Sequence, residues 1–581
     1  MQIAAVVVTC VVPLALWILV SGLDDVFISV VFFCTRRRPF PWPEDHALEA
    51  ASERPIAILV PLWHEHRVIA RMLEHNLAAI RYSSYDIFVG VYPNDNETRL
   101  AVEAVASAHS RVHLVLGPHD GPTSKGDCLN WVYHGMERHE RARGIRYEIV
   151  MTHDAEDLAD PDSLRLVSWF SRDYSMVQVP VLALPTAITE LTHGLYCDEF
   201  AEFQTKDIPV RQRLGGFLPA NGVGTGFARA ALEHLASTRG GMIFDPACLT
   251  EDYENGFRLH ALGYPQIFLP VRLRGGRPVA TREYFPRNFR SATRQRSRWV
   301  AGITLQGWQN HRWRGTWRQK YWFFRDRKGL LGNLLTPLAN LLFLAGLGSL
   351  VTRGHVAILF PLWLSRLCLL TYAISIVQVG MRAWASARIY GWRFAAATPV
   401  RVAWGNAVNF VATLSAIEHF TGALLAQTTM SWGKTEHVYP RPRLGELLVR
   451  TRAVAVGDVE SAAGTLPRGM RIGEHLVGLR KLSEDNLYRA LSLQSGIPAG
   501  PIGAREVDRL ATRAFPAEVS RRRKVLPFRM ETGELYVATA DVPSAELRRE
   551  LARFSAMEIR YRLVRPVEFA RLEREYLPPR G

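Results

Sequence analysis

Long apolar runs near the start of the chain and in its second half predict membrane-spanning helices. Residues 3–23 and 330–351 carry no charge, and residues 356–379 are interrupted only by Arg366. A run of about 20 apolar residues is long enough to cross the hydrocarbon core of a bilayer. We therefore expect three transmembrane helices, the first of them within residues 1–35.

Basic residues flank these runs on one side and set the expected orientation. They are Arg36, Arg37 and Arg38 after the first run, Arg325, Arg327 and Lys328 before the second, and Arg382, Arg388 and Arg393 after the third. Basic flanks stay on the cytoplasmic side of the membrane. The N-terminus is therefore expected outside, in the periplasm of a bacterial inner membrane, and both large polar parts of the chain in the cytoplasm.

Residues 401–427 are apolar but contain Asn406, Asn409, Glu418 and His419. This pattern favours an amphipathic helix that lies in the membrane interface. The Trp- and Arg-rich stretch 299–324 has the same character. A fourth span at 401–427 is the alternative, and it would place everything after it outside. Residues 311–437 are thus expected to hold interfacial helices and two transmembrane helices.

A different pattern, in which short β-rich runs alternate with helical segments, covers residues 50–310. The runs Ile56–Pro61, Ile87–Tyr92 and Glu148–His153 predict strands, and residues 67–80 and 127–143 between them have helical periodicity. Such alternation predicts an α/β fold with a mostly parallel sheet covered by helices. Ligands of such sheets bind beyond the carboxyl ends of the strands.

Acidic residues stand at these strand ends. Asp95 follows the second run, and Asp154, Glu156 and Asp157 follow the third. Two carboxylates one residue apart can share a hard divalent cation, Mg²⁺ or Mn²⁺, which neutralises a diphosphate. A solvated turn is the alternative. Glu156 and Asp157 both remain candidates for the second ligand beside Asp154.

Two further motifs lie downstream. Thr250-Glu251-Asp252 precedes a helical segment and is explained either by an ordinary capped helix or by a carboxylate that acts as a general base. Gln295-Arg-Ser-Arg298-Trp299 combines an Arg that can clamp phosphate with a Trp that can stack on a sugar. An interfacial basic helix is the alternative for this second motif.

In this order and spacing the motifs resemble the processive family-2 glycosyltransferases, the group of the cellulose and hyaluronan synthases, whose catalytic domain has the GT-A fold. The resemblance covers about residues 50–310 and implies inverting transfer from a UDP-sugar. The residues that it implies are Asp95, Lys125, Asp154, Gln295, Arg298 and Trp299 for the donor, Asp154 and Glu156 for the metal, Asp252 with Glu251 for catalysis, and Asn221, Gly222 and Trp299 on the acceptor side. Glu156 departs from the pattern, because an Asp is usual there.

Residues 440–581 are soluble in composition and begin with an imperfect repeat. Arg443-Leu-Gly-Glu-Leu-Leu-Val449 matches Arg471-Ile-Gly-Glu-His-Leu-Val477, 28 residues later. A paired helical bundle without a ligand would explain the spacing. The pattern RxGxxL, followed by spaced Leu and a Gln, resembles the cyclic di-GMP-binding N-terminal domain of type II secretion and pilus-assembly ATPases.

This second resemblance implies a small, mainly helical or α+β nucleotide-sensor domain with cyclic di-GMP as its allosteric activator. The implied ligand residues are Arg443, Leu444, Gly445, Leu448, Arg471, Ile472, Gly473, Leu476, Leu487, Leu491 and Gln494. The first copy has Ala463 and Leu466 where the second has Leu491 and Gln494, which would weaken its half of the site.

The net charge and the cysteine content indicate which binding partners and which kinds of chemistry to expect. The net charge is +16, and Trp and Arg cluster together between Arg287 and Lys328, which favours a lipid bilayer over nucleic acid. Six widely spaced cysteines without a CxxC pair indicate buried thiols rather than zinc or disulfide chemistry.

Transferase and sensor together resemble the bacteriophage N4 adsorption protein B family, inner-membrane enzymes of exopolysaccharide production. The resemblance implies a glycan acceptor and an outer-membrane export partner. Two alternatives stay open. One is a catalytically silent membrane receptor or assembly protein that keeps the glycosyltransferase fold, and the other is a scaffold whose C-terminal part binds a protein.

Overall fold

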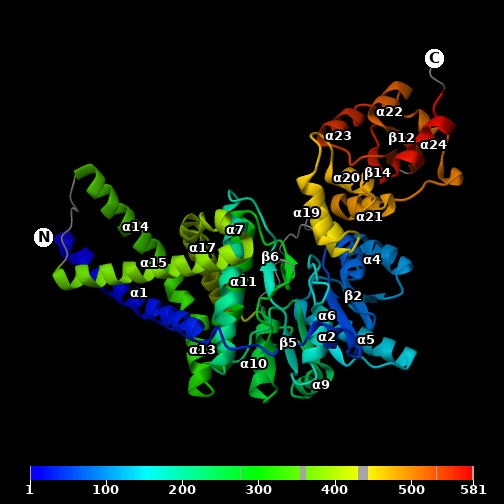
Figure 1. Cartoon of the computed structure of the whole chain (residues 1–581). Helices are drawn as coiled ribbons and strands as arrows, with labels where there is room; N and C mark the ends of the chain where they lie inside the picture. Colours follow the sequence, from blue (N-terminus) through cyan, green and yellow to red (C-terminus); the bar gives the residue numbers. More distant parts are fainter. Residues whose placement is uncertain (1, 275–276, 354–360, 429–442, 532, 579–581) are drawn as a thin grey trace. The chain divides into compact units, whose positions relative to one another are not determined.

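The computed structural model describes the chain except for residues 1, 275–276, 354–360, 429–442, 532 and 579–581 (Figure 1). The chain divides into two compact units, Met1–Met72 with Ile80–Pro440, and Arg441–Gly581 with Leu73–Ala79. The boundary expected at 437–440 lies outside the described residues.

A seven-stranded sheet forms the centre of the first unit, in the order β3-β2-β1-β4-β7-β5-β8. Its strands are β1 Ile56–Pro61, β2 Tyr85–Val91, β3 Val112–Leu116, β4 Ile149–Thr152, β5 Met176–Gln178, β7 Thr225–Ala228 and β8 Gln266–Phe268. The first four strands run parallel to one another, whereas β7 is antiparallel to both β4 and β5. The predicted α/β fold is confirmed, with one reversed strand in the sheet.

Helices surround this sheet and two small accessory pairs, β6 Val181–Ala183 with β11 Thr281–Glu283, and β9 Leu273–Arg274 with β10 Arg277–Pro278. The helices are α2 Asp45–Ala50, α3 Ile69–Ala79, α4 Asn96–Ala108, α5 Lys125–Arg143, α6 Ser163–Phe170, α7 Leu191–Glu202, α8 Ile208–Arg213, α9 Arg229–Ser237, α10 Glu251–Ala261, α11 Phe289–Trp299 and α12 Gly307–His311. Apolar side chains of α5, such as Val132 and Met136, pack with Leu59 and Phe88 of the sheet in one buried core.

Long apolar helices complete the first unit: α1 Gln2–Thr35, α14 Gly329–Arg353, α15 Leu362–Tyr390 and α17 Thr398–Ala426, with the shorter α13 Trp317–Arg327 and α16 Trp392–Ala395. Among the described residues, four stretches are long and apolar enough to cross a membrane, namely Val11–Thr35, Trp317–Gly346, Leu362–Tyr390 and Thr398–Ala426. That is one more than the three expected spans, because α17 also meets these criteria. The chain is therefore a membrane protein by the length and composition of its helices. In Figure 1, α1, α14 and α15 extend to one side of the unit.

The expected spans fall within these helices. Residues 3–23 lie in α1, residues 330–351 in α14, and residues 362–379 in α15, while the start of the third expected span, residues 356–360, lies outside the described residues. α17 covers the ambiguous segment 401–427 almost entirely. One face of α17 is buried at a spacing of three or four residues, at Thr398, Arg401, Gly405, Val408, Ala412 and Ala416.

The second unit repeats a pair of helices. The pairs are α18 Leu444–Arg450 with α19 Val456–Gly464, and α20 Ile472–Gly478 with α21 Glu484–Ser495. Both helices of the second pair begin 28 residues after their counterparts, in step with the sequence repeat. Arg452 and Arg480, which occupy equivalent positions, share a left-handed backbone with φ of 57°. The repeat is therefore a structural one.

A three-stranded sheet follows these helices, with β13 Glu534–Thr539 between β12 Val525–Glu531 and β14 Glu558–Leu563. β12 is antiparallel to β13, and β14 is parallel to it. The remaining helices are α22 Ala517–Arg523, α23 Ala545–Leu551 and α24 Pro566–Tyr576, with short 3₁₀ turns at Ala504–Glu506 and Ala511–Arg513. This unit is the α+β domain that the sequence predicts.

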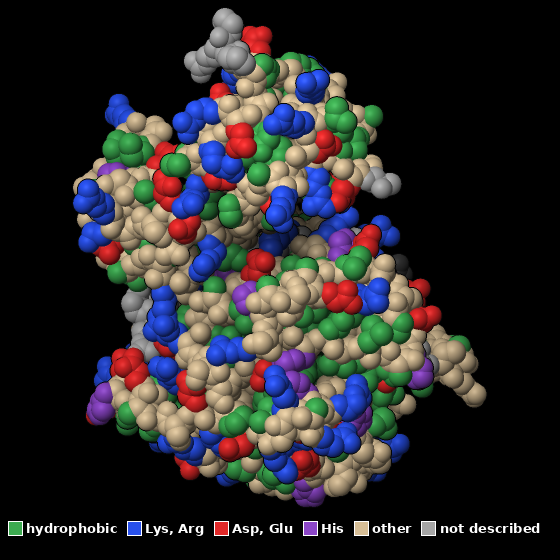
Figure 2. Space-filling view, turned by 90° about the vertical axis from the view of Figure 1, so that its right-hand side faces the viewer, with side chains coloured by type: hydrophobic (Ala, Val, Ile, Leu, Met, Phe, Trp, Pro, Cys, Tyr) green, Lys and Arg blue, Asp and Glu red, His purple; other side chains and the backbone are tan. Residues whose placement is uncertain are grey.

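The surface carries both signs of charge. Figure 2 shows Lys and Arg side chains over the face that it views, interspersed with Asp and Glu. Among the described cysteines, Cys128, Cys197 and Cys248 are buried free thiols, as predicted, whereas Cys34 is exposed.

Candidate active site

A cavity of about 550 Å³ opens beyond the carboxyl ends of β1 and β4. Of the residues implicated by the sequence, the cavity is lined by Lys125, Asp154, Glu156, Asn221, Glu251, Asp252, Gln295, Arg298 and Trp299. The fold thus brings together residues that are far apart in the chain.

Lys125 lies at the centre of this constellation. It is the first residue of α5, after the N-cap Ser124, whose side chain accepts from the N–H of Asp127. Its Nζ atom is 2.7 Å from Oδ1 of Asp154 and 4.0 Å from Oε1 of Glu251. Burial alone would lower the pKa of Lys125, but Asp154, Glu251 and Asp252 raise it above its ordinary value. A permanent cation is therefore held among three carboxylates.

The turn after β4 distinguishes the two candidates for the second metal ligand. Asp157 is fully buried, and its Oδ2 atom accepts from Nδ1 of His153 at 3.0 Å and from the N–H of Asp154 at 2.8 Å. Its carboxylate therefore fixes the turn. Glu156 lines the cavity beside Asp154, whereas Asp157 does not. This arrangement favours Glu156 as the partner of Asp154.

A further carboxylate, Glu283 at the end of β11, also lines the cavity. Burial raises its pKa well above the ordinary value, and the nearby charges of Asp157 and Asp154 act in the same direction. Negative charge is thus crowded around the Asp154 turn. Oxygen ligands with excess negative charge are the environment that Mg²⁺ and Mn²⁺ prefer, so the residues present fit a divalent cation held by Asp154 and Glu156.

Glu251 and Asp252 occupy the first turn of α10. Burial raises the pKa of Glu251 to about 7, and it also raises the pKa of Asp252, while Lys125 opposes both shifts. Oδ1 of Asp252 accepts from the N–H of Tyr253 at 2.8 Å. The opposite Oδ2 atom faces Gly222, where φ is +75° and a Cβ would lie only 2.6 Å from it. Gly222 thereby places the predicted acceptor loop against the carboxylate.

The QxxRW residues lie on α11 and all three line the cavity. The aromatic ring of Trp299 approaches Tyr196 and Phe200, with centroids 6.0 and 6.2 Å away. Two π-helical segments adjoin the cavity, η1 Phe203–Asp207 and η2 Val300–Gln306. Such segments are rare and concentrate at functional sites.

Asp95 is the predicted donor residue that does not line this cavity. It caps α4, and its side chain is almost fully buried. Oδ2 accepts from the N–H of His64 at 2.5 Å, and Oδ1 accepts from that of Thr98 at 3.3 Å. In this structure its carboxylate organises the loop between β1 and α3. A role for Asp95 in donor binding stays a prediction.

The cavity is also lined by charged residues that the sequence did not assign to a site, although Arg325 and Arg382 were expected as basic flanks of the spans. They extend from the transfer site to the membrane helices: Glu199, Glu202, Asp207, Arg211, Arg325, Asp326 and Arg382. Although burial acts in the opposite direction, Lys206 and Arg382 lower the pKa of Glu202 to about 2. Nε of Arg382 donates to Oε2 of Glu202 at 2.8 Å, which joins α15 to α7.

Asp24 and Asp25 of α1 lie beyond these charged cavity residues, and they contact protein side chains. Nζ of Lys328 lies 2.8 Å from Asp24 and 2.7 Å from Asp25, and Gln378 donates to Asp25 at 3.0 Å. In the sequence, the pair Asp24-Asp25 directly follows the uncharged run 3–23, and this pair of acidic residues is the signal that could have indicated the network.

The residues of the second unit that are implied for the nucleotide differ in their exposure to solvent. Arg443 and Arg471 precede α18 and α20 and are exposed, whereas Leu448 and Leu476 are fully buried. The side chains of these two leucines therefore hold the helices together and do not offer apolar surface to a ligand. Gly473 and Leu487 are also buried. The remaining implied residues are half-buried, namely Leu444, Gly445, Ile472, Leu491 and Gln494.

Gly473 fits a close helix contact, because a Cβ there would lie 2.6 Å from Cδ1 of Leu487. Arg471 is engaged by an acidic neighbour, since its Nη1 atom is 2.8 Å from Oδ1 of Asp541.

Comparisons with known proteins match both the transferase domain and the C-terminal domain. Residues 54–302 match the family model "Glycosyltransferase like family 2", and residues 495–581 match the family model "MshEN domain", a domain type that binds cyclic di-GMP. "Bacteriophage adsorption protein B" of Escherichia coli (strain K12) is 33% identical over 597 residues, which cover 95% of this chain and 79% of that protein.

The chain belongs to the bacteriophage adsorption protein B family. "Bacteriophage N4 adsorption protein B" of Escherichia coli O157:H7 has the same identity and coverage. The resemblances drawn from the motifs are thereby confirmed for the glycosyltransferase domain, for the MshEN domain and for the family. The MshEN match begins after the RxGxxL repeat, so the repeat residues themselves stay predictions.

Two solved structures are also similar. "Structure of MshE with cdg" is 25% identical and covers 23% of this chain and 99% of that one, with a TM-score of 0.23. A mannosyltransferase from Pyrobaculum calidifontis in complex with GDP-Man and Mn²⁺ is 16% identical and covers 68% of this chain and 99% of that one, with a TM-score of 0.43.

Proposed function

We propose that this protein is an inverting glycosyltransferase of the bacterial inner membrane that is activated by cyclic di-GMP. It transfers a sugar from a UDP-sugar to a growing exopolysaccharide or another glycan acceptor. The observation that supports this most is one cavity lined by a buried lysine, the Asp154–Glu156 pair, the acidic start of α10 and the QxxRW residues.

The donor end of the cavity has the charges that a nucleoside diphosphate requires. Lys125 and Arg298 supply fixed positive charge for its phosphate oxygens. A divalent cation bound by Asp154 and Glu156 would neutralise the leaving diphosphate. Charges that are already in place cost little reorganisation as the glycosidic bond to UDP breaks.

We assign the role of general base to Asp252. It lines the cavity, and its Oδ2 atom faces Gly222. In a single displacement, the acceptor hydroxyl attacks the anomeric carbon while its proton passes to the carboxylate and UDP leaves from the opposite face. One such displacement inverts the anomeric configuration. Glu251, held near Lys125, sets the local charge around this base.

The acceptor belongs to the end of the cavity that faces the membrane helices. Trp299 and Phe200 provide aromatic surface there, and Glu199 and Glu202 provide acceptors for sugar hydroxyls. Sugars present apolar ring faces and many hydroxyls, which matches this mixture.

The second unit is the proposed sensor. Arg443 and Arg471 are exposed and equivalent in the repeat, and Arg is the side chain suited to guanine edges and phosphates. Cyclic di-GMP activates the enzyme if it binds the active state more tightly than the inactive one.

The proposed location follows the basic flanks of the spans. The transferase and sensor domains lie in the cytoplasm, the N-terminus lies in the periplasm, and an outer-membrane protein receives the product for export.

A donor screen tests the proposal. Purified full-length protein in lipid nanodiscs is supplied with individual UDP-sugars, Mn²⁺ and cyclic di-GMP, and UDP release is measured. We expect release with one donor class, and we expect Asp252→Asn to abolish release while donor binding persists. Binding of a donor without any turnover would instead support the catalytically silent receptor.

A further inference from the structure

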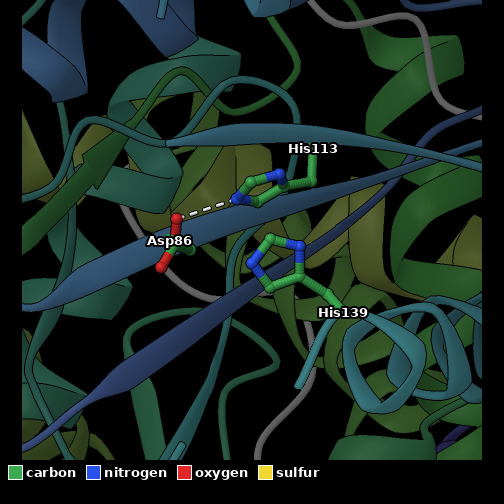
Figure 3. Close-up of side chains that lie close together, drawn as sticks. All are labelled: Asp86, His113 and His139. Atoms are coloured by element: carbon green, nitrogen blue, oxygen red, sulfur yellow. Dashed lines mark hydrogen bonds and ion pairs between the residues drawn. The ribbon is translucent and has the colours of Figure 1, made fainter. Parts of the chain in front are cut away.

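Three side chains outside the active-site cavity converge as a metal site would require (Figure 3). Asp86 is the second residue of β2, His113 is the second residue of β3, and His139 lies in the last turns of α5. One ligand atom from each residue lies within 4.8 Å of the others. All three side chains are partly exposed to solvent, so an ion could reach them.

This cluster is separate from the proposed donor site. Because β2 and β3 are parallel, their second residues lie at the amino ends of the strands, whereas the cavity lies beyond the carboxyl ends. The seven residues of β2 span roughly 20 Å at about 3.3 Å per residue. A cation bound here would not contact the diphosphate of a donor.

The surroundings orient the carboxylate and one imidazole. Oδ1 of Asp86 is 2.8 Å from Nε2 of His113, and Oδ2 accepts from the hydroxyl of Tyr147 at 2.7 Å. Phe88 stacks on His113 with ring centroids 4.9 Å apart. Hydrogen bonds that fix a ligating carboxylate and packing that fixes an imidazole are what supports a metal site from its second shell.

His139 distinguishes this cluster from an ordinary Asp–His pair. Its ring lies 4.2 Å from that of His113, centroid to centroid, and within the described part of the chain no side chain forms a hydrogen bond with its imidazole. An imidazole nitrogen that has no hydrogen-bond partner can offer its lone pair to a metal.

We propose that Asp86, His113 and His139 bind one zinc ion. Two imidazoles and one carboxylate are a donor set that suits Zn²⁺ better than the hard cations Mg²⁺ and Ca²⁺, and three protein ligands leave one position for water. The bound ion links the edge strand β3 to β2 and to α5. It therefore stabilises the folded transferase domain, because an ion that binds only the native state shifts unfolding.

The test compares two histidines of the same helix. His139→Ala removes a proposed ligand but leaves the Asp86–His113 pair, whereas His134→Ala removes an exposed histidine that pairs with Glu137. Full-length protein without an affinity tag is stripped with a chelator, incubated with Zn²⁺ and excess Mg²⁺, and desalted. Bound zinc is counted by plasma mass spectrometry, and thermal unfolding is measured with and without Zn²⁺.

We expect His139→Ala to retain one zinc ion fewer per chain than the wild type and His134→Ala. We also expect Zn²⁺ to raise the unfolding temperature of the wild type and of His134→Ala, but not that of His139→Ala. Asp86→Asn provides a second variant, because the amide can keep its hydrogen-bonding neighbours while losing the anionic ligand. It should retain less zinc than wild type. Equal zinc content in wild type, His139→Ala and Asp86→Asn would overturn the proposal.

Discussion

Gly222 is the residue whose replacement should damage transfer most selectively. Its left-handed backbone costs any other residue roughly 1–2 kcal/mol, and its Cβ would lie 2.6 Å from Oδ2 of Asp252. Gly222→Ala should therefore reduce kcat by about 100-fold or more, because it displaces the proposed base. UDP release at saturating donor measures this effect.

Gly144 is the matched control. It has a similar φ of +65°, but a Cβ added there would have no other atom within 4 Å, so Gly144→Ala carries the backbone cost alone. We expect both variants to be destabilised and only Gly222→Ala to lose transfer. Equal transfer activity of Gly222→Ala and Gly144→Ala would show that the contact between residue 222 and Asp252 does not affect transfer.

The carboxylates of α10 predict an unusual pH dependence. Burial raises the pKa of Glu251 to about 7 and raises that of Asp252. A general base works only when deprotonated, so activity is present above the raised pKa and is lost as the pH falls through it. We therefore expect kcat to decline as the pH falls through the raised pKa of Asp252, which lies above the value near 4 of an ordinary carboxyl group.

A pH profile of kcat under saturating donor checks this prediction. Glu251→Gln removes a charge that couples to Asp252 and should move the acidic limb to lower pH. An acidic limb of the wild type that remains near pH 4 would contradict the assignment.

Asp541 should limit the affinity of the proposed sensor for its nucleotide. It holds Arg471 at 2.8 Å, and both side chains are more than half exposed. An exposed ion pair is worth about 0.2–1 kcal/mol, so releasing Arg471 with Asp541→Asn should strengthen cyclic di-GMP binding by up to about fivefold. Asp458→Asn, which frees Lys481 instead, should have no effect. Calorimetric titration of the full chain compares them, and weaker binding by Asp541→Asn would refute the idea.

Sequence reasoning found the cavity residues that carry motifs and missed those that do not. Asp154 and Glu156 follow a recognisable strand, so their place could be predicted. Adjacent acidic residues cannot be distinguished by spacing, and both Glu156 and Asp157 are buried. What separates them is that Asp157 accepts hydrogen bonds from His153 and from the N–H of Asp154. Glu202 escaped notice because an acidic residue four positions before Lys206 is an ordinary helix pattern.

At the scale of elements, α17 is fastened to the transferase domain through a buried ion pair. Nε and Nη2 of Arg401 donate to Asp198 of α7 at 2.7 and 2.9 Å, and Ser386 of α15 donates to the same carboxylate at 2.6 Å. Both charged side chains are fully buried. Periodicity predicted an amphipathic helix here, but it could not reveal the partner, which lies about 200 positions earlier.

Breaking this pair should loosen three helices at once. Removing one partner leaves a buried charge alone, which costs about 3–5 kcal/mol. Asp198→Asn and Arg401→Gln should each lower the thermal unfolding temperature in detergent and reduce transfer. Arg393→Gln, at an exposed position near the start of α17, should change neither property. Unchanged stability in both buried variants would contradict the anchoring role.

At the scale of the whole molecule, three strands of the large sheet and the apolar runs within α1, α14 and α15 could be predicted, because each follows from local hydrophobic patterning. The same patterning left α17 ambiguous between an interfacial and a spanning helix. The direction of the reversed strand β7 could not be predicted, since its pairing with β4 and β5 joins segments as far apart as Ile149 and Ala228. Likewise, the RxGxxL repeat predicts paired helices, but not which leucines face the core, as Leu448 and Leu476 do.

The central claim joins the two units: a nucleotide sensor controls a sugar transferase. The most direct test is the rate of UDP release by purified full-length protein at saturating donor, measured across a titration of cyclic di-GMP, with Asp252→Asn and Arg471→Gln in parallel. We predict a saturable rise in the wild type, no release by Asp252→Asn, and a rise displaced to higher nucleotide concentration in Arg471→Gln. A wild-type rate that is the same with and without cyclic di-GMP would contradict the account.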